Sequence, residues 1–145
     1  RVGVNNTFFQ MPKFRTMKVD TPEVASHLVE NTANYLTPIG GTLRRFSLDE
    51  IPQLYSVFRG HMSFVGPRPA LFNQDDLIFL RRQEGIDKLI PGITGWAQIN
   101  GRDNISIPNK VELDFEYLQK KSFIFDLSII LSTIVKVISK KDVSH

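Results

Sequence analysis

The clearest periodic pattern in the chain covers residues 122–140. Apolar side chains recur there at intervals of three and four residues, which is typical of one face of an α-helix. The run is interrupted by Asp126 and is shorter than the ~18–20 apolar residues that span a bilayer. Two interpretations stay open: a buried core helix, and a helix at a membrane surface with Lys136 and the lysines after it directed to lipid headgroups. The apolar positions on this face are Phe123, Leu127, Ile130, Leu131, Ile134, Val137 and Ile138.

Shorter hydrophobic stretches, separated by glycine and proline, predict several small elements before this helix. One or two short strands are expected within residues 7–17, and a loop with a strand within 91–102, where glycine is too frequent for a helix. Residues 35–42 are expected to form a turn-rich link, and residues 61–68 a short apolar run that enters a rigid turn. Helices are predicted over residues 22–31, 47–59, 73–84 and 108–119. The pattern indicates a single α+β domain over residues 1–145, rich in helices, with a few short strands and amphipathic membrane-surface helices.

Composition narrows the class of protein. The 145 residues suffice for one domain with a sizeable core, and the 41% hydrophobic and 23% charged residues exclude a disordered tail. The net charge is +3, from 18 basic and 15 acidic residues, which favours anionic partners such as phosphates or an acidic membrane face. This charge is too weak to predict nucleic-acid binding. There is no cysteine, so disulfides and thiolate metal sites are excluded, and the three histidines are too scattered for a metal site.

The strongest candidate for chemistry is a pair of adjacent carboxylates, Asp49 and Glu50, just after Arg44 and Arg45. An aspartate can attack a phosphoryl group, while arginine and a metal ion hold the oxygens that gain charge. The structural alternative is a capping box, in which Ser47 and Glu50 begin a helix and the acids favour its dipole. The neighbouring arginines favour the functional interpretation.

Other basic and polar positions extend this hypothesis. Arg68 lies between two prolines, which stiffen its backbone and suit it to a bidentate phosphate contact; the alternative is a structural turn with a solvated arginine. Lys13 and Arg15 would share one face of a strand. Asp114 lies on a predicted helix and would normally be solvated.

The segment 91–102 combines the groups that a nucleotide requires. Its glycines allow backbone to approach a ligand, Trp96 offers an aromatic plane, and Arg102 offers a cation. In the alternative interpretation Trp96 belongs to the core. The polar side chains available for the base, ribose and phosphates are Thr94, Gln98, Asn100 and Arg102.

Taken together, these segments resemble the bacterial sugar transferases, the monotopic polyprenyl-phosphate phosphoglycosyl transferases. The resemblance covers nearly the whole chain, and its motifs occur in the order found in that family. The segment Leu113 to Leu118 and the last helix with Asp126 follow them as expected. The motifs are Lys-Phe-Arg-Thr-Met at 13–17, Ser-Leu-Asp-Glu-Ile-Pro-Gln-Leu at 47–54, Met-Ser-Phe-Val-Gly-Pro-Arg-Pro at 62–69 and Pro-Gly-Ile-Thr-Gly-Trp-Ala-Gln-Ile-Asn-Gly-Arg at 91–102.

The resemblance implies an enzyme that transfers sugar-1-phosphate from a UDP-sugar to polyprenyl (undecaprenyl) phosphate, releases UMP, and so initiates synthesis of a bacterial surface polysaccharide or glycoconjugate. It implies that Asp49 is the nucleophile, which forms an aspartyl phosphosugar, and that Glu50 ligates the Mg²⁺ that spans the diphosphate. Further functional positions of the family, taken as substrate-binding, fall on Lys13, Arg44, Arg68, Arg102 and Asp114.

The resemblance also implies a place in the cell, the cytoplasmic face of the inner (plasma) membrane. Family members begin with a hydrophobic segment that enters and leaves the same membrane face. The chain opens at Arg1 in mid-pattern, so we expect a fragment without that anchoring segment. Two other functions are weighed: a metal-dependent phosphohydrolase that uses Asp49, and a non-catalytic nucleotide- or membrane-binding module. The sugar and the oligomeric state stay open.

Overall fold

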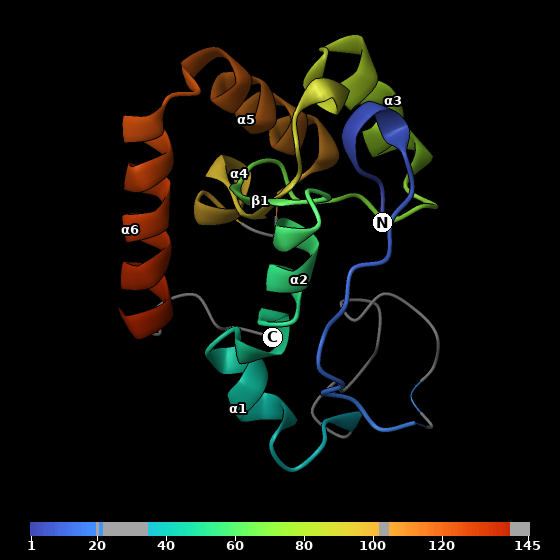
Figure 1. The fold of residues 1–145 in the computed structure, drawn as a ribbon, viewed down its shortest axis with the longest axis vertical. Coiled ribbons are helices and arrows are strands. Elements are labelled where there is room, and N and C mark those ends of the chain that lie inside the picture. Colours follow the sequence, from blue (N-terminus) through green and yellow to red (C-terminus); the bar gives the residue numbers. More distant parts are fainter. Residues whose placement is uncertain (20, 22–34, 102–104, 140–145) are drawn as a thin grey trace.

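The computed structural model describes residues 1–19, 21, 35–101 and 105–139. Within these residues the chain forms short helices around a small parallel sheet (Figure 1), which confirms the predicted α+β class. The α-helices are α1 (Gly40–Arg45), α2 (Gln53–Phe58), α3 (Asp75–Gln83), α4 (Trp96–Ile99), α5 (Ile107–Lys120) and α6 (Phe123–Ser139). Single 3₁₀ turns cover Val4–Asn6, Leu48–Glu50 and Ile86–Lys88. The strands are β1 (Ser63–Val65) and β2 (Gly92–Thr94).

The two strands pair in parallel, with Ser63 opposite Gly92 and Val65 opposite Thr94. Between them the chain passes through α3, so the sheet joins segments that are far apart in the sequence. Glycine is required where the strands end. A Cβ added to Gly92 would lie 2.2 Å from the backbone nitrogen of Gly66, and one added to Gly95 would lie 2.1 Å from the Gly66 carbonyl oxygen. These glycines therefore approach another strand, whereas the sequence suggested an approach to a ligand.

The core lies on both sides of α5. The helix begins after the exposed residue Ser106, whose Oγ accepts a hydrogen bond from the Asn109 amide at 3.4 Å, and Pro108 lies in its first turn. Val111 packs toward α3, and Tyr117 packs toward β1 and α6. One cluster of buried residues contains Val2, Ala70, Leu77, Ile86 and Val111, and the other contains Val65, Tyr117 and Ile129.

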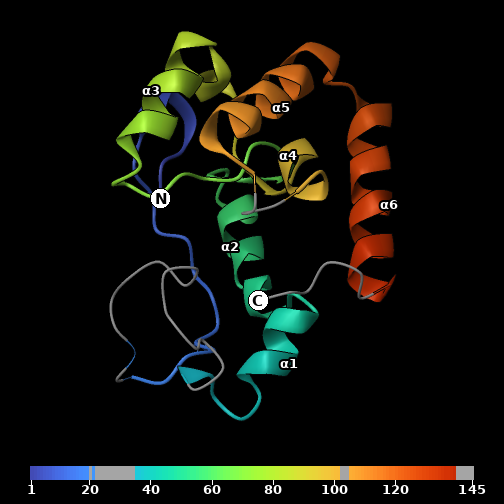
Figure 2. The same cartoon turned by 180° about the vertical axis from the view of Figure 1, so that it is seen from behind.

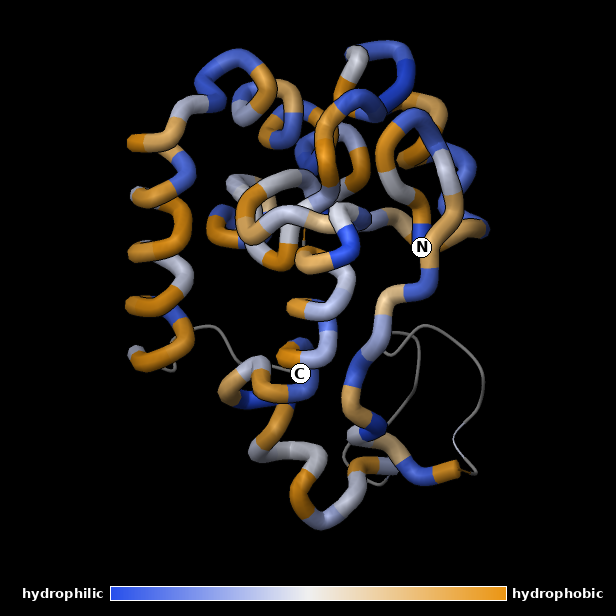
Figure 3. Tube along the Cα trace, viewed as in Figure 1, coloured by the Kyte–Doolittle hydropathy of each residue, from blue (hydrophilic) through white to orange (hydrophobic). Residues whose placement is uncertain are grey.

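Helix α6 stands at the edge of the molecule, and both views show it beside α4 and α5 (Figures 1 and 2). Its inner side is tied by polar contacts: the Tyr117 hydroxyl donates to Asp126 Oδ1 at 2.7 Å, and the Thr94 and Thr133 hydroxyls lie 2.7 Å apart. Ile129 is fully buried there. The hydropathy colouring marks most of α6 as hydrophobic (Figure 3). The outer side carries a row of exposed apolar side chains, formed by Phe123, Ile124, Leu127, Leu131, Ile134, Val135 and Ile138.

This arrangement bears on the two interpretations of the periodic pattern, of which the membrane-surface one stays a prediction. Most of the predicted apolar face is exposed, so the buried-core interpretation is wrong for that face. Lys136 does not extend outward either, since its Nζ donates to the carbonyl of Ile99 on the inner side. Among the helices that the structure describes, none is both long and apolar enough to cross a bilayer.

The chain around the paired carboxylates differs from the predicted single helix over 47–59. Helix α1 already begins at Gly40, in the expected link, and ends before Ser47, which has a left-handed backbone with φ of 55°. The Ser47 side chain makes no capping hydrogen bond, so the predicted capping box is absent from this described turn. A residue with a positive φ cannot continue a right-handed helix, so the helix is interrupted at Ser47. Asp49 and Glu50 lie in the 3₁₀ turn that follows.

The other predicted elements are confirmed in part. The predicted strands within 7–17 are reduced to isolated bridges, Val2 with Phe8 and Met17 with Leu36. Segment 91–102 contains the expected strand and also the short helix α4, despite its glycines. The predicted end of α3 at Gly85 is confirmed, with a φ of 72° that suits glycine. The predicted helix over 22–31 lies outside the described residues.

Candidate functional site

An open cavity of about 440 Å³ is lined by the 3₁₀ turn Leu48–Glu50, the two strands, α2, α4 and α6. Five of the predicted site residues line it, although they come from distant parts of the sequence: Lys13, Arg44, Asp49, Glu50 and Arg68. The rest of the wall mixes polar side chains with an apolar part, which is formed by Ile51, Leu54, Phe64, Ile93, Ile99 and Val137. The cavity thus offers a strongly charged surface and a hydrophobic one to the same ligand.

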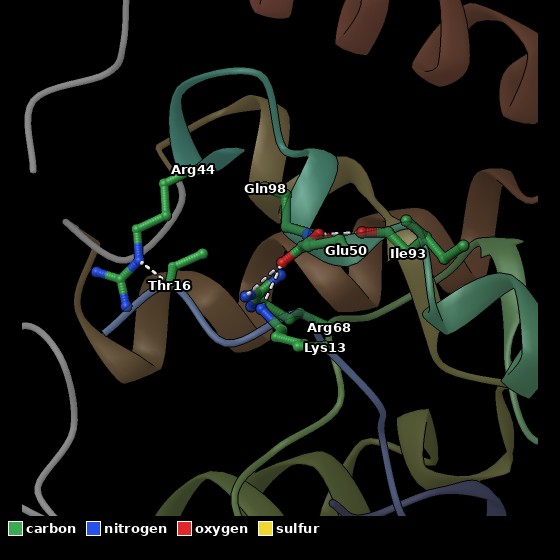
Figure 4. A network of polar contacts seen from close by, with 7 residues as sticks. All are labelled: Lys13, Thr16, Arg44, Glu50, Arg68, Ile93 and Gln98. Carbon is green, nitrogen blue, oxygen red and sulfur yellow. Dashed lines mark hydrogen bonds and ion pairs between the residues drawn. The ribbon is translucent and has the colours of Figure 1, made fainter. Parts of the chain in front are cut away.

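Glu50 is the centre of the charged surface (Figure 4). Its Oε1 accepts a hydrogen bond from Lys13 Nζ at 2.7 Å and one from Arg68 Nη2 at 3.3 Å. Burial alone would raise the pKa of Glu50, but the charges of Arg68 and Lys13 and their hydrogen bonds outweigh it and lower the pKa below 4.5. Glu50 is therefore an anion at neutral pH, held between two cations.

Backbone contacts explain how Lys13 reaches this position. The amide of Phe14 donates to the carbonyl of Asp49 at 3.0 Å, which fastens the N-terminal segment alongside the 3₁₀ turn. Lys13 then faces Glu50, while the Phe14 ring is half exposed. At this point the predicted strand within residues 7–17 is replaced by the single backbone hydrogen bond between Phe14 and Asp49.

Arg44 lies at the end of α1 and is fixed by a different partner. Its Nε donates to Thr16 Oγ1 at 2.8 Å, and Figure 4 shows this pair apart from the Glu50 group. Close packing supports the contact, because a Cβ at Gly40 would lie 2.2 Å from the Thr16 carbonyl oxygen. Arg44 is thereby held at the cavity wall, with its Nε bound to Thr16 and not to Glu50.

Asp49 is the second carboxylate of the cavity and is only 9% exposed. It follows the left-handed Ser47 by two residues, so a locally unfavourable backbone precedes it. Residues held in such conformations concentrate at functional sites, where the surrounding structure enforces them. Asp49 therefore combines low exposure, a constrained turn just before it and a place in the same cavity wall as Lys13, Arg44 and Arg68.

One predicted site residue, Asp114, is not brought into this group, and another lies outside the described residues. Asp114 is buried, 1% exposed, and lies outside the cavity wall as far as the described residues define it. Its Oδ2 accepts hydrogen bonds from Arg81 Nε at 3.0 Å and Nη2 at 2.5 Å, so the expectation of a solvated acid is wrong. Burial raises the pKa of Asp114 above 3.8, against the opposing charge of Arg81. Arg102 lies outside the described residues.

Sequence reasoning missed residues at and behind this cavity. Arg81 was not singled out, although it follows the buried Leu77 by four residues and so lies on the core side of α3. A cation on the apolar face of a helix is the signal that could have found it. Thr133 and Lys136 also line the cavity, on the inner side of α6.

Trp96 packs against the core, as the alternative interpretation predicted. Its Nε1 donates to Glu116 Oε2 at 2.7 Å, and its ring centroid lies 5.1 Å from that of Phe125. Within the described residues the ring does not line the cavity, so it offers no platform to a ligand there. Gln98 does line it, and its Nε2 donates to the Ile93 carbonyl at 3.0 Å (Figure 4).

Comparison with known proteins agrees with this geometry. Residues 1–140 match the family described as bacterial sugar transferase. The sugar transferase EpsL of Bacillus subtilis is 41% identical over all of this chain, which spans 70% of its length. An undecaprenyl-phosphate glucose phosphotransferase of Komagataeibacter xylinus is 39% identical over 98% of the chain, which spans 29% of that relative. A UDP-glucose:undecaprenyl-phosphate glucose-1-phosphate transferase of Escherichia coli is 39% identical over 94% of the chain, which spans 31% of it. The chain belongs to the bacterial sugar transferase family.

Proposed function

We propose that this protein transfers sugar-1-phosphate from a UDP-sugar to polyprenyl phosphate and releases UMP. The printed activities of the Komagataeibacter and Escherichia relatives support this reaction class. The observation that carries the proposal is the cavity, in which Asp49 and Glu50 lie among Lys13, Arg44 and Arg68. Its charged wall suits the diphosphate, and its apolar wall suits the isoprenoid chain.

The reaction proceeds in two displacements at Asp49. In the first, a carboxylate oxygen of Asp49 attacks the phosphorus that carries the sugar; a new O–P bond forms, the bond to the bridging oxygen breaks, and UMP leaves with that electron pair. In the second, a phosphate oxygen of the lipid attacks the same phosphorus, and the Asp49 carboxylate departs. An acyl phosphate is reactive enough for this second step. Lys13, Arg44 and Arg68 hold the phosphate oxygens in line.

The donor groups of the cavity fit Mg²⁺, which Glu50 would hold. Within the described residues no group of three or more acidic, histidine or cysteine side chains forms a complete metal site. This suits Mg²⁺, which typically binds through one or two carboxylates together with substrate phosphates and water. The bound ion would neutralise charge on the diphosphate. The chain's own cations, Lys13 and Arg68, already share one Glu50 oxygen and can turn toward the incoming phosphates.

The lipid acceptor and the outer face of α6 together favour a membrane surface as the place of reaction. The exposed apolar row on α6 lies on the side opposite its cavity-lining residues Thr133 and Lys136. Immersing this row in the lipid interface would bury apolar area and place the cavity close to the headgroups. We assign the protein to the cytoplasmic face of the inner membrane and to the first step of a surface polysaccharide or glycoconjugate.

Covalent labelling tests the proposal. Full-length enzyme in membranes, given UDP-sugar with a radiolabelled sugar and no acceptor, should release UMP and retain label up to one equivalent. Asp49→Asn should abolish both, because the amide keeps the side-chain shape and loses the nucleophile. With acceptor, the double-reciprocal lines should be parallel. Continuous UMP release without acceptor would indicate a hydrolase, absence of UMP a binding module, and intersecting lines without label a direct transfer.

A further inference from the structure

Arg81 connects the buried acid Asp114 to the cavity arginine. It uses Nε and Nη2 for the Asp114 carboxylate, and its Nη1 donates to the backbone carbonyl of Arg68 at 2.8 Å. The Arg68 side chain in turn donates to Glu50. One guanidinium thus joins α5, through Asp114, to the turn after β1 that carries a cavity residue.

The hydrogen bond from Arg81 Nη1 to the Arg68 carbonyl restrains the one backbone rotation at Arg68 that the neighbouring prolines leave open. Pro67 and Pro69 each fix their own φ, and Pro69 also restricts Arg68 to extended conformations. The rotation that remains, about the bond that orients the Arg68 carbonyl, is the one that the hydrogen bond from Arg81 Nη1 restrains. Because the guanidinium of Arg68 extends from this backbone, fixing the carbonyl fixes where the side chain begins.

We infer that Arg81 and Asp114 are positioning residues, which act on substrate phosphate only through Arg68 and Glu50. This inference rests on the proposed function, because the role of Arg68 in holding phosphate is part of that proposal. It assigns Asp114 a place behind the cavity and gives Arg81 a role in transfer. A simple stabilising ion pair would need the Asp114 contacts alone and leaves the bond to the Arg68 carbonyl unexplained.

Arg81→Lys is the informative variant, because lysine keeps a cation near Asp114 but cannot hold the carboxylate and the Arg68 carbonyl together. It should lower kcat for UMP release about 10²-fold, as expected when a phosphate ligand is misplaced, with a much smaller change in KM. Arg82→Lys is the matched control, since Arg82 is exposed on the same helix and should keep full activity.

A double-mutant cycle separates positioning from an independent effect. Arg68→Lys alone should lose at least as much activity as Arg81→Lys, and the double variant should be within about threefold of Arg68→Lys, because Arg81 acts through Arg68. If the two losses multiply, Arg81 acts by another route and the inference is overturned. Wild-type activity of Arg81→Lys would overturn it as well.

An apolar replacement guards against loss of folding. Arg81→Met combined with Asp114→Leu removes both charges and keeps similar volume, which commonly preserves stability. This variant should melt like the wild type and still lose about 10²-fold in kcat. Recovery of full activity together with stability would mean a purely structural pair and would reject the inference. If the wild-type enzyme itself releases no UMP from any UDP-sugar, the proposed function has failed, a result distinct from each of these.

Discussion

Two groups of oppositely charged side chains are linked in this fold by the hydrogen bond from Arg81 to the Arg68 carbonyl, and they differ in their surroundings. In the first, Glu50 is 17% exposed and shares one oxygen between Lys13 and Arg68 at the cavity wall. In the second, Asp114 is 2% exposed and binds Arg81 through two nitrogens. The chemical groups are nearly the same, but only the first can exchange its partners for a ligand.

The comparison shows why charge type alone does not identify a substrate-binding residue. A partly exposed carboxylate with two cations can release them to incoming phosphates at little cost, since water screens each charge. A buried carboxylate with a single arginine cannot, because either partner left alone in the interior is strongly destabilising. Glu50 is therefore suited to ligand exchange, and Asp114 to holding structure.

The largest expected contrast is in activity. Glu50→Gln should lower kcat by about 10²–10³-fold, the usual effect of deleting one charged contact to the transition state. Its free energy of unfolding should change by no more than about 1 kcal/mol, because the ion pairs are partly exposed. UMP release and chemical denaturation measure the two effects. Glu112→Gln, an exposed acid on α5, is the control and should alter neither.

Asp114→Asn should lower the free energy of unfolding more than Glu50→Gln does. The substitution leaves the Arg81 cation buried without its carboxylate, and the free energy of unfolding should fall by about 3–5 kcal/mol. Urea denaturation at neutral pH measures this loss. Near-wild-type stability would mean that the two groups are equivalent in their surroundings, against the burial described above.

Substitution of Ser47, in the turn just before the two carboxylates, should have a smaller effect on stability than Asp114→Asn. Ser47 has a left-handed φ of 55°, so Ser47→Val should destabilise the protein by about 1–2 kcal/mol, because a β-branched residue fits that region poorly. Ser47→Gly accepts the conformation and should retain wild-type stability. Thermal melting of the pair, with activity measured in parallel, would show whether the turn serves the carboxylates. Equal stabilities for valine and glycine would contradict the left-handed assignment.

The smallest expected effect is on pH dependence, and it has opposite signs for the two acids. Glu50 has a lowered pKa, so the stability it contributes is present above about pH 4.5 and is lost as the pH falls through its folded pKa. Asp114 has a raised pKa, so ionising its buried carboxyl costs folding free energy as the pH rises from about 3.8 through its folded pKa, although at neutral pH Arg81 still needs this carboxylate as its partner. Denaturation of Glu50→Gln and Asp114→Asn from pH 3 to pH 7 should give differences from wild type with opposite slopes.

The sequence predicted the elements whose signals are local. The helices with clear periodicity, now α3, α5 and α6, lie where expected, and Gly85 ends α3 as predicted. The chain around Ser47 could not be predicted, because its local signal for a capping box competes with contacts made elsewhere, such as the bond between Phe14 and Asp49. The exposure of the apolar row on α6 also depends on tertiary packing: Asp126, which interrupts the run, faces Tyr117.

For the site, charge and spacing together with the family resemblance proposed Lys13, Arg44, Asp49, Glu50 and Arg68, and the fold brings all five to one cavity. Their roles stay predictions until the variants are assayed. The position of Asp114 could not be inferred, because its partner Arg81 is 33 residues away in the sequence and nothing local announces the pair. Long-range pairing of buried charges is a property of the packed structure.

The close approach of the two strands bears on how a saturation mutagenesis map of this protein should be interpreted. Replacing Gly66, Gly92 or Gly95 by alanine would force a methyl group to within 2.1–2.3 Å of backbone atoms that have no room to move. Such positions should tolerate as few residues as the proposed nucleophile Asp49, although they do not line the cavity. Depletion in a growth selection would therefore mark this close contact between the strands as strongly as Asp49. Protein abundance, measured beside growth, would distinguish the two, since only the glycine variants should disappear from the cell.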